Sequence, residues 1–239
     1  FTGTFALSSF SGSAQIGSTS SRTATVQTTA ANSAPTLGDF TYEDSNTATK
    51  NITEDNRLFI QNHSVLKVTP GTATAKNGAT ITNYTASCNG LSVSNSTGAA
   101  LSVGKITKSG NVMVTLTITD SRGYTAGISK AVTVIPYSKP NVSSITLRRT
   151  NDIEAEMQLI FSGSIFAVLV NGVQKNSVVY VRYRYKKTNE SSYGAFTSIL
   201  GGTTRSGTSF SYSNLELCNL DANSSYDFHL QVQDKLYSA

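Results

Sequence analysis

Apolar and polar residues alternate along four stretches of the chain, residues 111–120, 152–161, 178–187 and 225–234. A period of two places one face of a β-strand in a core and the other in solvent, so the pattern predicts half-buried antiparallel strands. Helical periodicity is hard to find anywhere. The residues predicted to face inward are Val112, Val114, Leu116, Ile118, Ile153, Ala155, Met157, Leu159, Phe161, Val179, Val181, Tyr183, Tyr185, Tyr226, Phe228, Leu230 and Val232.

The composition favours the same fold class. Only 14% of the residues are charged and tryptophan is absent, whereas Thr, Val, Ile, Tyr, Ser, Asn and Gly are plentiful. These residues fill pleated surfaces and turns. Short alternating strands separated by turn clusters are typical of β-sandwiches. The sequence therefore predicts an all-β protein built of tandem antiparallel β-sandwiches.

Proline-containing clusters divide the chain. One surrounds Pro35 and another contains Pro136 and Pro140, and each precedes a new run of strands. They predict a leader over residues 1–33, a module over 34–136 and a module over 137–239. Aligning Asp120 with Asp234 superposes the alternating residues before each aspartate, which indicates a tandem repeat.

The second module carries a more specific pattern. Leu220 precedes Tyr226 by six residues, and Tyr226 opens an alternating strand. This arrangement resembles the tyrosine corner of fibronectin type III sandwiches, in which the tyrosine hydroxyl bonds to backbone a few residues upstream. The resemblance implies a last strand after Asp234, but the sequence stops at Ala239. Truncation of a longer polypeptide is the simplest expectation. The alternative is that the leader strand expected over residues 21–29, a remnant of a preceding module, fills this position in a neighbouring molecule.

The first module has valine at 112, where a tyrosine corner would need tyrosine. Its stretches "FIQNHSVLKVTPGTATAKNGATITNYTASCNG" and "TITDSRGYTAGISKAVTVIPYSKP" resemble the immunoglobulin-like repeats of minor structural and tail proteins in tailed phages of Gram-positive bacteria. The resemblance implies an immunoglobulin-like sandwich followed by a fibronectin type III-like one. It also implies a non-enzymatic structural or display role in the virion, in the tail or tail tip, with contact to the host surface.

The partners expected in that setting are other virion proteins, copies of the chain itself, and host cell-wall glycan. Two alternatives stay open from the sequence. One is a stalk module of a bacterial surface adhesin, displayed on the cell surface. The other is an accessory β-module of a secreted carbohydrate-active enzyme.

The turn Asp120-Ser121-Arg122-Gly123 combines an acid, a base and a glycine. We interpret it as a hairpin, with Asp120 capping the turn through its side chain and Gly123 at positive φ. Arg122 is expected to point to solvent, and Tyr124 after Gly123 excludes an Arg-Gly-Asp adhesion motif.

The sequence gives little indication of a catalytic site. The two histidines, His63 and His229, have no serine or cysteine in a nucleophile setting and are interpreted as ordinary surface residues. Glu154 and Glu156 are adjacent on one strand face, whereas glycosidase carboxylates come from separate segments that flank a cleft. The chain is therefore predicted to be no enzyme and to need no cofactor.

Metal binding and disulfide bonding are also weakly indicated. Cys88 and Cys218 fall in different modules, so they are expected to be buried thiols or, alternatively, an inter-module bridge. No Cys/His cluster or calcium loop occurs, so no metal is predicted. An oxygen-ligand site is conceivable only in an early acidic set: Asp39, Glu43, Asp44, Glu54 and Asp55.

The net charge of +5 is spread over the chain without a basic run, which argues against nucleic-acid binding. No apolar run approaches 18 residues, so no membrane span is predicted. The best binding candidate is the outward face of residues 178–187. It presents Tyr180, Arg182, Arg184 and Lys186, with His229 on the neighbouring strand. Cations beside an aromatic ring suit phosphate-bearing or sugar ligands, although a solvated sheet face is the plainer alternative.

Overall fold

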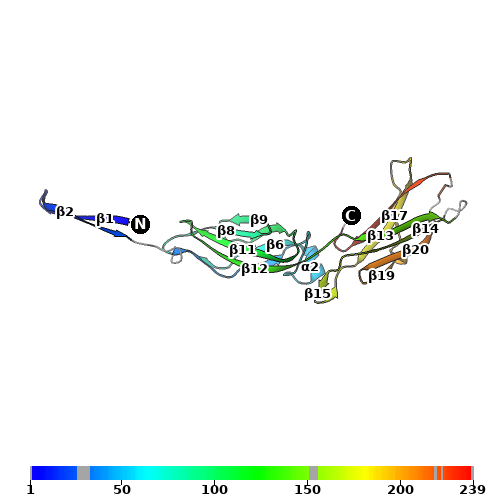
Figure 1. Cartoon of the computed structure of the whole chain (residues 1–239), viewed down its shortest axis with the longest axis horizontal. Helices are drawn as coiled ribbons and strands as arrows, with labels where there is room; N and C mark the ends of the chain where they lie inside the picture. Colours follow the sequence, from blue (N-terminus) through cyan, green and yellow to red (C-terminus); the bar gives the residue numbers. More distant parts are fainter. Residues whose placement is uncertain (1, 26–32, 151–155, 218–219, 222, 238–239) are drawn as a thin grey trace.

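We describe the protein from a computed structural model, which covers residues 2–25, 33–150, 156–217, 220–221 and 223–237. A β-hairpin and two β-sandwiches follow one another along the long axis of the molecule (Figure 1). The all-β class with antiparallel sandwiches, predicted from period-two alternation, is confirmed.

The chain begins with an antiparallel hairpin of β1 (Thr2–Ser11) and β2 (Ala14–Thr25). Residues 21–25 of the leader strand expected over residues 21–29 do form a strand, as the end of β2, but this strand is paired and not free. Ser21 pairs with Ala6 inside this hairpin, and residues 26–29 lie outside the described residues. The partner was missed because β1 is short of charges and reads as irregular Ser/Thr-rich sequence.

The first sandwich packs a three-stranded sheet, β10-β6-β4, on a five-stranded sheet, β5-β12-β11-β8-β9, beside the short pair β3-β7. The core is shared by both sheets, with Leu66 and Val68 of β6 packed against Val114 and Leu116 of β11. The strands are β3 (Thr36–Leu37), β4 (Thr41–Asp44), β5 (Phe59–Ile60), β6 (Val65–Thr69), β7 (Ala73–Thr74), β8 (Ile81–Cys88), β9 (Leu91–Asn95), β10 (Leu101–Lys105), β11 (Gly110–Asp120) and β12 (Thr125–Ile135).

One short helix, α2 (Thr47–Thr53), interrupts the strands of the first sandwich, and the alternation pattern did not predict it. Asn46 caps its start by accepting a hydrogen bond from Ala48 N, and Glu54 ends it in the left-handed conformation at φ 54°. Local capping of this kind allows a helix of two turns that has little amphipathic pattern of its own.

The second sandwich packs a four-stranded sheet, β13-β14-β20-β19, on a three-stranded sheet, β18-β17-β21. Phe161 of β14 and Val181 of β17 meet in its core. The elements are β13 (Asn141–Arg149), β14 (Glu156–Ser164), β15 (Leu169–Val170), β16 (Val173–Gln174), β17 (Val178–Lys187), β18 (Thr197–Ser198), the 3₁₀ helix η1 (Leu200–Gly202), β19 (Thr204–Ser206), β20 (Ser209–Leu217) and β21 (Tyr226–Asp234).

The inward-facing residues agree with the alternation pattern except at the start of β17. Val178 is buried there, whereas Val179, which was predicted to face inward, is only half-buried. The pairing of β17 with β21 shifts between Val178 and Tyr180, which is a β-bulge. A bulge inserts one unpaired residue and reverses the alternation before it, which the sequence pattern does not reveal. Ile153 and Ala155 lie outside the described residues.

The corner before β21 is held by a tyrosine hydroxyl. Asp221 N donates to Tyr226 Oη at 2.8 Å, five residues upstream along the chain, and Leu220 packs against the core. Asp221 is also fixed by Asn223 N and Ser224 Oγ, and these bonds, with Lys187, lower its pKa to about 2.

Tyr226→Phe should lower the free energy of unfolding by about 1 kcal/mol, because it removes the acceptor of Asp221 N and leaves the ring in place. Urea unfolding followed by tyrosine fluorescence measures this loss. Tyr180→Phe is the matched control, since the Tyr180 side chain is exposed. Equal losses in the two variants would show that this corner bond does not stabilise the fold.

The two sandwiches meet in a small apolar cluster of Ile60, Tyr137, Val168 and Leu236. Lys175 Nζ lies 2.7 Å from Glu54 Oε2 across the same junction. Apolar packing and a cross-junction ion pair together join the sandwiches end to end.

Candidate functional site

A ladder of cationic side chains covers the outer face of β17. Arg182, Arg184 and Lys186 alternate with residues whose side chains enter the core, so all three point away from it. Although they point outward, the three side chains are partly covered and do not extend freely into solvent. The cause is aromatic stacking: the Arg182 and Arg184 Cζ atoms lie 4.1 and 4.4 Å from the centroid of the Phe196 ring.

Two aromatic residues of the ladder were missed by the sequence interpretation. The connection between β17 and β18 brings Tyr193 and Phe196 onto the ladder, where Arg184 lies 4.8 Å and Lys186 5.6 Å from the Tyr193 ring. Tyr180 extends the ladder at the other end, 5.3 Å from Arg182. Aromatic residues in an otherwise Ser/Gly-rich loop next to a cationic strand are the signal that could have indicated them.

The neighbouring strand β21 fixes the two arginines. Arg182 Nε donates to Gln231 Oε1 at 2.5 Å, and Arg184 Nε donates to His229 Nδ1 at 3.2 Å. His229 also lies edge-on to Tyr193, with ring centroids 5.9 Å apart. His229 thus lies on the outer face of the strand beside the cationic residues, as the alternation pattern predicts, and it accepts a hydrogen bond from Arg184 there.

We call this set the β17 ladder: Tyr180, Arg182, Arg184, Lys186, Tyr193, Phe196 and His229. It borders a surface groove of about 540 Å³ that runs to Val142, Leu230 and Val232. Guanidinium groups held in fixed positions suit planar or tetrahedral anions such as carboxylate and phosphate. Exposed ring faces beside them offer apolar surface to a ligand that carries both kinds of group, such as an anionic sugar polymer.

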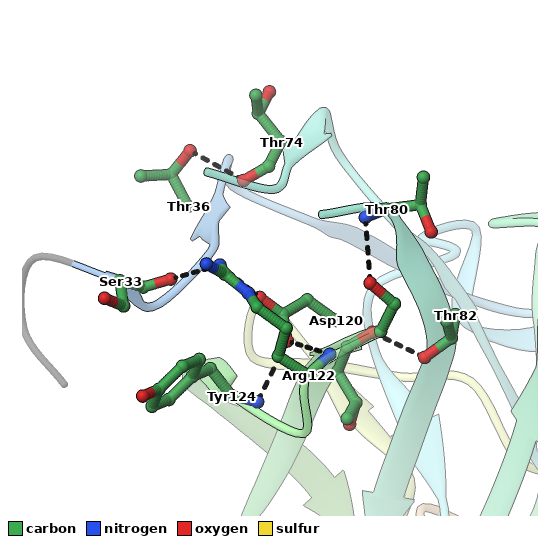
Figure 2. A network of polar contacts seen from close by, with 10 residues as sticks. Ser33, Thr36, Thr74, Thr80, Thr82, Asp120, Arg122 and Tyr124 are labelled. Carbon is green, nitrogen blue, oxygen red and sulfur yellow. Dashed lines mark hydrogen bonds and ion pairs between the residues drawn. The ribbon is translucent and has the colours of Figure 1, made fainter. Parts of the chain in front are cut away.

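The Asp120 turn is the second candidate, and Figure 2 shows its polar network. Asp120 is buried, and its Oδ1 accepts hydrogen bonds from Arg122 N at 2.9 Å and Tyr124 N at 3.0 Å. Gly123 has a φ of 86°, a left-handed conformation that costs glycine little. The aspartate side chain therefore organises the turn between β11 and β12.

Arg122 does not point to solvent as expected. Its Nη2 donates to Asp120 Oδ2 at 2.8 Å and to the carbonyl oxygen of Ser33 at 2.9 Å (Figure 2). Only the three-dimensional fold brings Ser33, before the first strand of the sandwich, beside this turn. Burial raises the pKa of Asp120, but the bonds from Arg122 and Tyr124 outweigh it and hold the pKa below its ordinary value. The carboxylate of Asp120 and the guanidinium group of Arg122 therefore both stabilise the fold around this turn.

His63 lies at the junction of the two sandwiches rather than on open surface, which corrects the sequence interpretation. Its ring lies edge-on to Tyr137, with centroids 4.8 Å apart, and its burial lowers its pKa. The other suspected catalytic group is Glu156, half-buried on β14 opposite Leu217, while Glu154 lies outside the described residues. These placements do not assemble a catalytic site.

The early acidic residues each bond to a different partner and do not form one cluster. Asp39 pairs with Lys130, Glu43 with Lys67 and Glu54 with Lys175, while buried Asp44 accepts from Asn46 N and Val65 N. Within the described ranges no three His, Cys, Asp or Glu side chains gather closely enough to hold a metal ion. Cys88 is a free, buried thiol whose burial raises its pKa, and Cys218 lies outside the described residues.

A helix long and apolar enough to cross a membrane does not occur in the described part of the chain.

Comparison with protein families matches residues 1–239 to the family described as "Siphovirus protein of unknown function (DUF859)". Comparison with curated proteins gave no match. Among solved structures, the chain is similar to one reported as "Structural basis for the promiscuous specificity of the carbohydrate-binding modules from the beta-sandwich super family". The similarity has 13% identity and a TM-score of 0.33, and covers 84% of this chain and 92% of that one.

Proposed function

Since the chain belongs to the siphovirus family DUF859, we propose that it is a non-enzymatic structural and display module of a phage virion, carried in the tail or tail tip. Siphoviruses are tailed phages, and extended tandem β-modules suit a part of the tail that spaces and presents binding surfaces. The two sandwiches joined end to end fit that requirement. The phage family favours this setting over a bacterial adhesin stalk or an accessory module of a secreted enzyme.

We further propose that the β17 ladder contacts the host cell surface. The observation that carries this proposal is the fixed stacking of Arg182 and Arg184 on Phe196, with Tyr180 and Tyr193 exposed at the two ends. Stacking holds both guanidinium groups in place before any ligand arrives, which lowers the entropy lost on binding. A cell-wall glycan with phosphate or carboxylate groups matches this mixture of charge and ring surface.

Replacing Arg182 and Arg184 together by glutamate should reduce binding of the purified chain to host cell walls at least tenfold. The change reverses the charge that attracts an anionic polymer, while both side chains lie outside the core. Co-sedimentation of the chain with cell walls of the host bacterium measures the effect.

The matched control is Arg148→Glu with Arg205→Glu, which changes the net charge by the same amount on the other sheet of this sandwich. The control variant should bind as the unaltered chain does. Equal losses in the two double variants would mean that net charge alone drives binding, and undiminished binding by the Arg182/Arg184 variant would exclude the ladder as the contact.

The position in the virion has its own test. Gold-labelled antibodies against the chain should decorate the tail or its tip in electron micrographs of intact phage. Label on the head alone would contradict a tail location.

A further inference from the structure

The β17 ladder holds its two arginines at a fixed spacing. One ring serves both of them, since the centroid of Phe196 lies 4.1 Å from Arg182 Cζ and 4.4 Å from Arg184 Cζ. Tyr180 lies on Arg182 at 5.3 Å. Tyr193 lies on Arg184 at 4.8 Å. Because each guanidinium group contacts two rings, neither can shift along the strand without losing favourable cation–ring contact.

Both guanidinium groups keep their outer nitrogen atoms available to a ligand. Each donates from Nε to β21, Arg182 to Gln231 and Arg184 to His229. In the part of the chain that the structure describes, the Nη atoms of these arginines have no hydrogen-bond acceptor and no carboxylate within ion-pair distance. A guanidinium fork with unused donors binds phosphate or carboxylate through paired hydrogen bonds.

Lys186, the third cation of the ladder, is in a different state. Its Nζ lies 3.4 Å from Asp227 Oδ2 and donates to the carbonyl oxygen of Glu190 at 2.6 Å. Its side chain is only 16% exposed. Since an acid already balances this charge, the part of the ladder suited to binding anions consists of Arg182 and Arg184.

The spacing of these two arginines selects among anionic polymers. They lie two residues apart on β17, so their Cα atoms are six covalent bonds and about 6.7 Å apart. Successive phosphorus atoms are also six bonds apart in a polymer whose phosphodiesters join three-carbon polyols. The order of phosphate, carbon spacer and phosphate in such a polymer matches the order of guanidinium, ring and guanidinium in the ladder.

Other anionic polymers match less well. A five-carbon polyol places eight bonds between phosphorus atoms, and a 1,4-linked uronic acid chain turns successive carboxylates to different sides. A single-stranded nucleic acid has the six-bond spacing, but it binds such proteins through bases stacked on ring faces. The Phe196 ring is already in contact with both guanidinium groups, so it is not open to a base.

We propose that the ligand of the β17 ladder is a linear polyol phosphate polymer with three carbons between phosphodiesters, and that Arg182 and Arg184 bind two successive phosphates. This assignment rests on the host-surface role proposed above for the ladder. The carbon spacer crosses the edge of the Phe196 ring, and the unused Nη donors of each arginine bind one phosphate.

Glycerol phosphate oligomers of defined length test the spacing. In calorimetric titrations of the full chain, the oligomer with two phosphates should bind about tenfold tighter than glycerol phosphate itself, because the second contact forms within one ligand. A ribitol phosphate oligomer with two phosphates should bind like a ligand with one. Oligogalacturonate and oligothymidylate with the same number of charges should bind more weakly than the glycerol phosphate oligomer.

Single substitutions test the residues. Arg182→Gln and Arg184→Gln should each reduce the affinity for the two-phosphate oligomer to that for glycerol phosphate. Lys186→Gln is the matched control, because it removes the same charge from the same strand face, where Asp227 already balances it. Phe196→Leu keeps every charge and loosens the spacing, so it should lower the preference for two phosphates over one.

Equal affinities for the one-phosphate and two-phosphate ligands, or for the glycerol and ribitol oligomers, would overturn the proposal. Tighter binding of oligogalacturonate or oligothymidylate would overturn it as well, and so would equal losses in the two arginine variants and the lysine control.

This proposal and the host-surface role can fail separately. A chain that binds host cell walls but not the glycerol phosphate oligomers would contradict this ligand and leave the host-surface role standing. A chain that binds the oligomers but not the cell walls would contradict that role and leave the ligand class standing.

Discussion

Asp234→Ala should lower the free energy of unfolding of the second sandwich by about 3 kcal/mol, the largest effect expected of any single polar substitution in it. The Asp234 carboxylate is 4% exposed and accepts from Tyr137 Oη at 2.9 Å and from Asn176 Nδ2 at 2.8 Å. It also accepts from Leu236 N at 2.9 Å and Tyr237 N at 2.7 Å. Alanine removes the acceptor of Tyr137 Oη, Leu236 N and Tyr237 N and leaves Asn176 Nδ2 with only the Phe166 carbonyl oxygen. Urea unfolding should therefore reveal an early transition of this sandwich.

The same substitution should loosen the junction, because Tyr137 belongs to the segment that enters the second sandwich. Burial, and then the charge of Asp234, raise the pKa of Tyr137, so its hydroxyl remains a donor at neutral pH. Tyr137→Phe is the matched comparison, since it removes one donor and keeps the ring packed. We expect that variant to lose about 1 kcal/mol. If Tyr137→Phe lost as much stability as Asp234→Ala, the hydrogen bond from Tyr137 would account for the whole effect, and the other donors to the carboxylate would contribute nothing.

Asp120→Ala should lower the melting temperature of the first sandwich by roughly 5–10 °C. The change removes the acceptor of Arg122 N and Tyr124 N and leaves the Arg122 guanidinium without its carboxylate. Asp120→Asn keeps an oxygen for the two backbone donors and should lose less. Differential scanning calorimetry measures both, and an unchanged melting temperature in the alanine variant would show that the turn forms without its cap.

The lowered pKa of Asp120 makes the stability of the fold depend on pH, and the direction of the shift decides the direction of this dependence. It lies below its ordinary value of 3.8, so the charged form stabilises the folded state. This contribution is complete above the unfolded-state pKa and is lost as the pH falls through the folded-state value. Below about pH 4, Asp120→Asn should therefore lose stability less steeply than the unaltered chain. Parallel curves would mean that the other carboxylates with lowered pKa values account for acid unfolding.

Asp120 and Asp234 show how far a repeat in sequence extends into structure. Their alignment predicts two equivalent strand ends, and in both sandwiches the carboxylate accepts backbone N–H groups of the turn that follows. The further partners differ, since one aspartate binds Arg122 and the other binds Tyr137 and Asn176. Turn capping and the pairing with Arg122 depend on neighbours in sequence, whereas Tyr137 and Asn176 come from distant segments. The predicted module limits at residues 33 and 136 stay predictions.

The β17 ladder likewise has one part that the sequence predicts and another part that only the fold brings together. Alternation along β17 predicts that Arg182, Arg184 and Lys186 share an outer face, because the side-chain period of a strand is a local property. Tyr193 and Phe196 join them only when the loop folds back, and their contacts with the guanidinium groups depend on that return.

What the sequence determined by itself is therefore the longest alternating strands, the face that most of their residues present, and the aspartate and glycine of the turn after β11. These follow from periodicity and local backbone preference. Tertiary structure alone decided that Arg122 holds Ser33 and that His63 lies against Tyr137. Each of those depends on which strands become neighbours across the sandwich, and contacts between residues far apart in the chain leave no periodic trace in it.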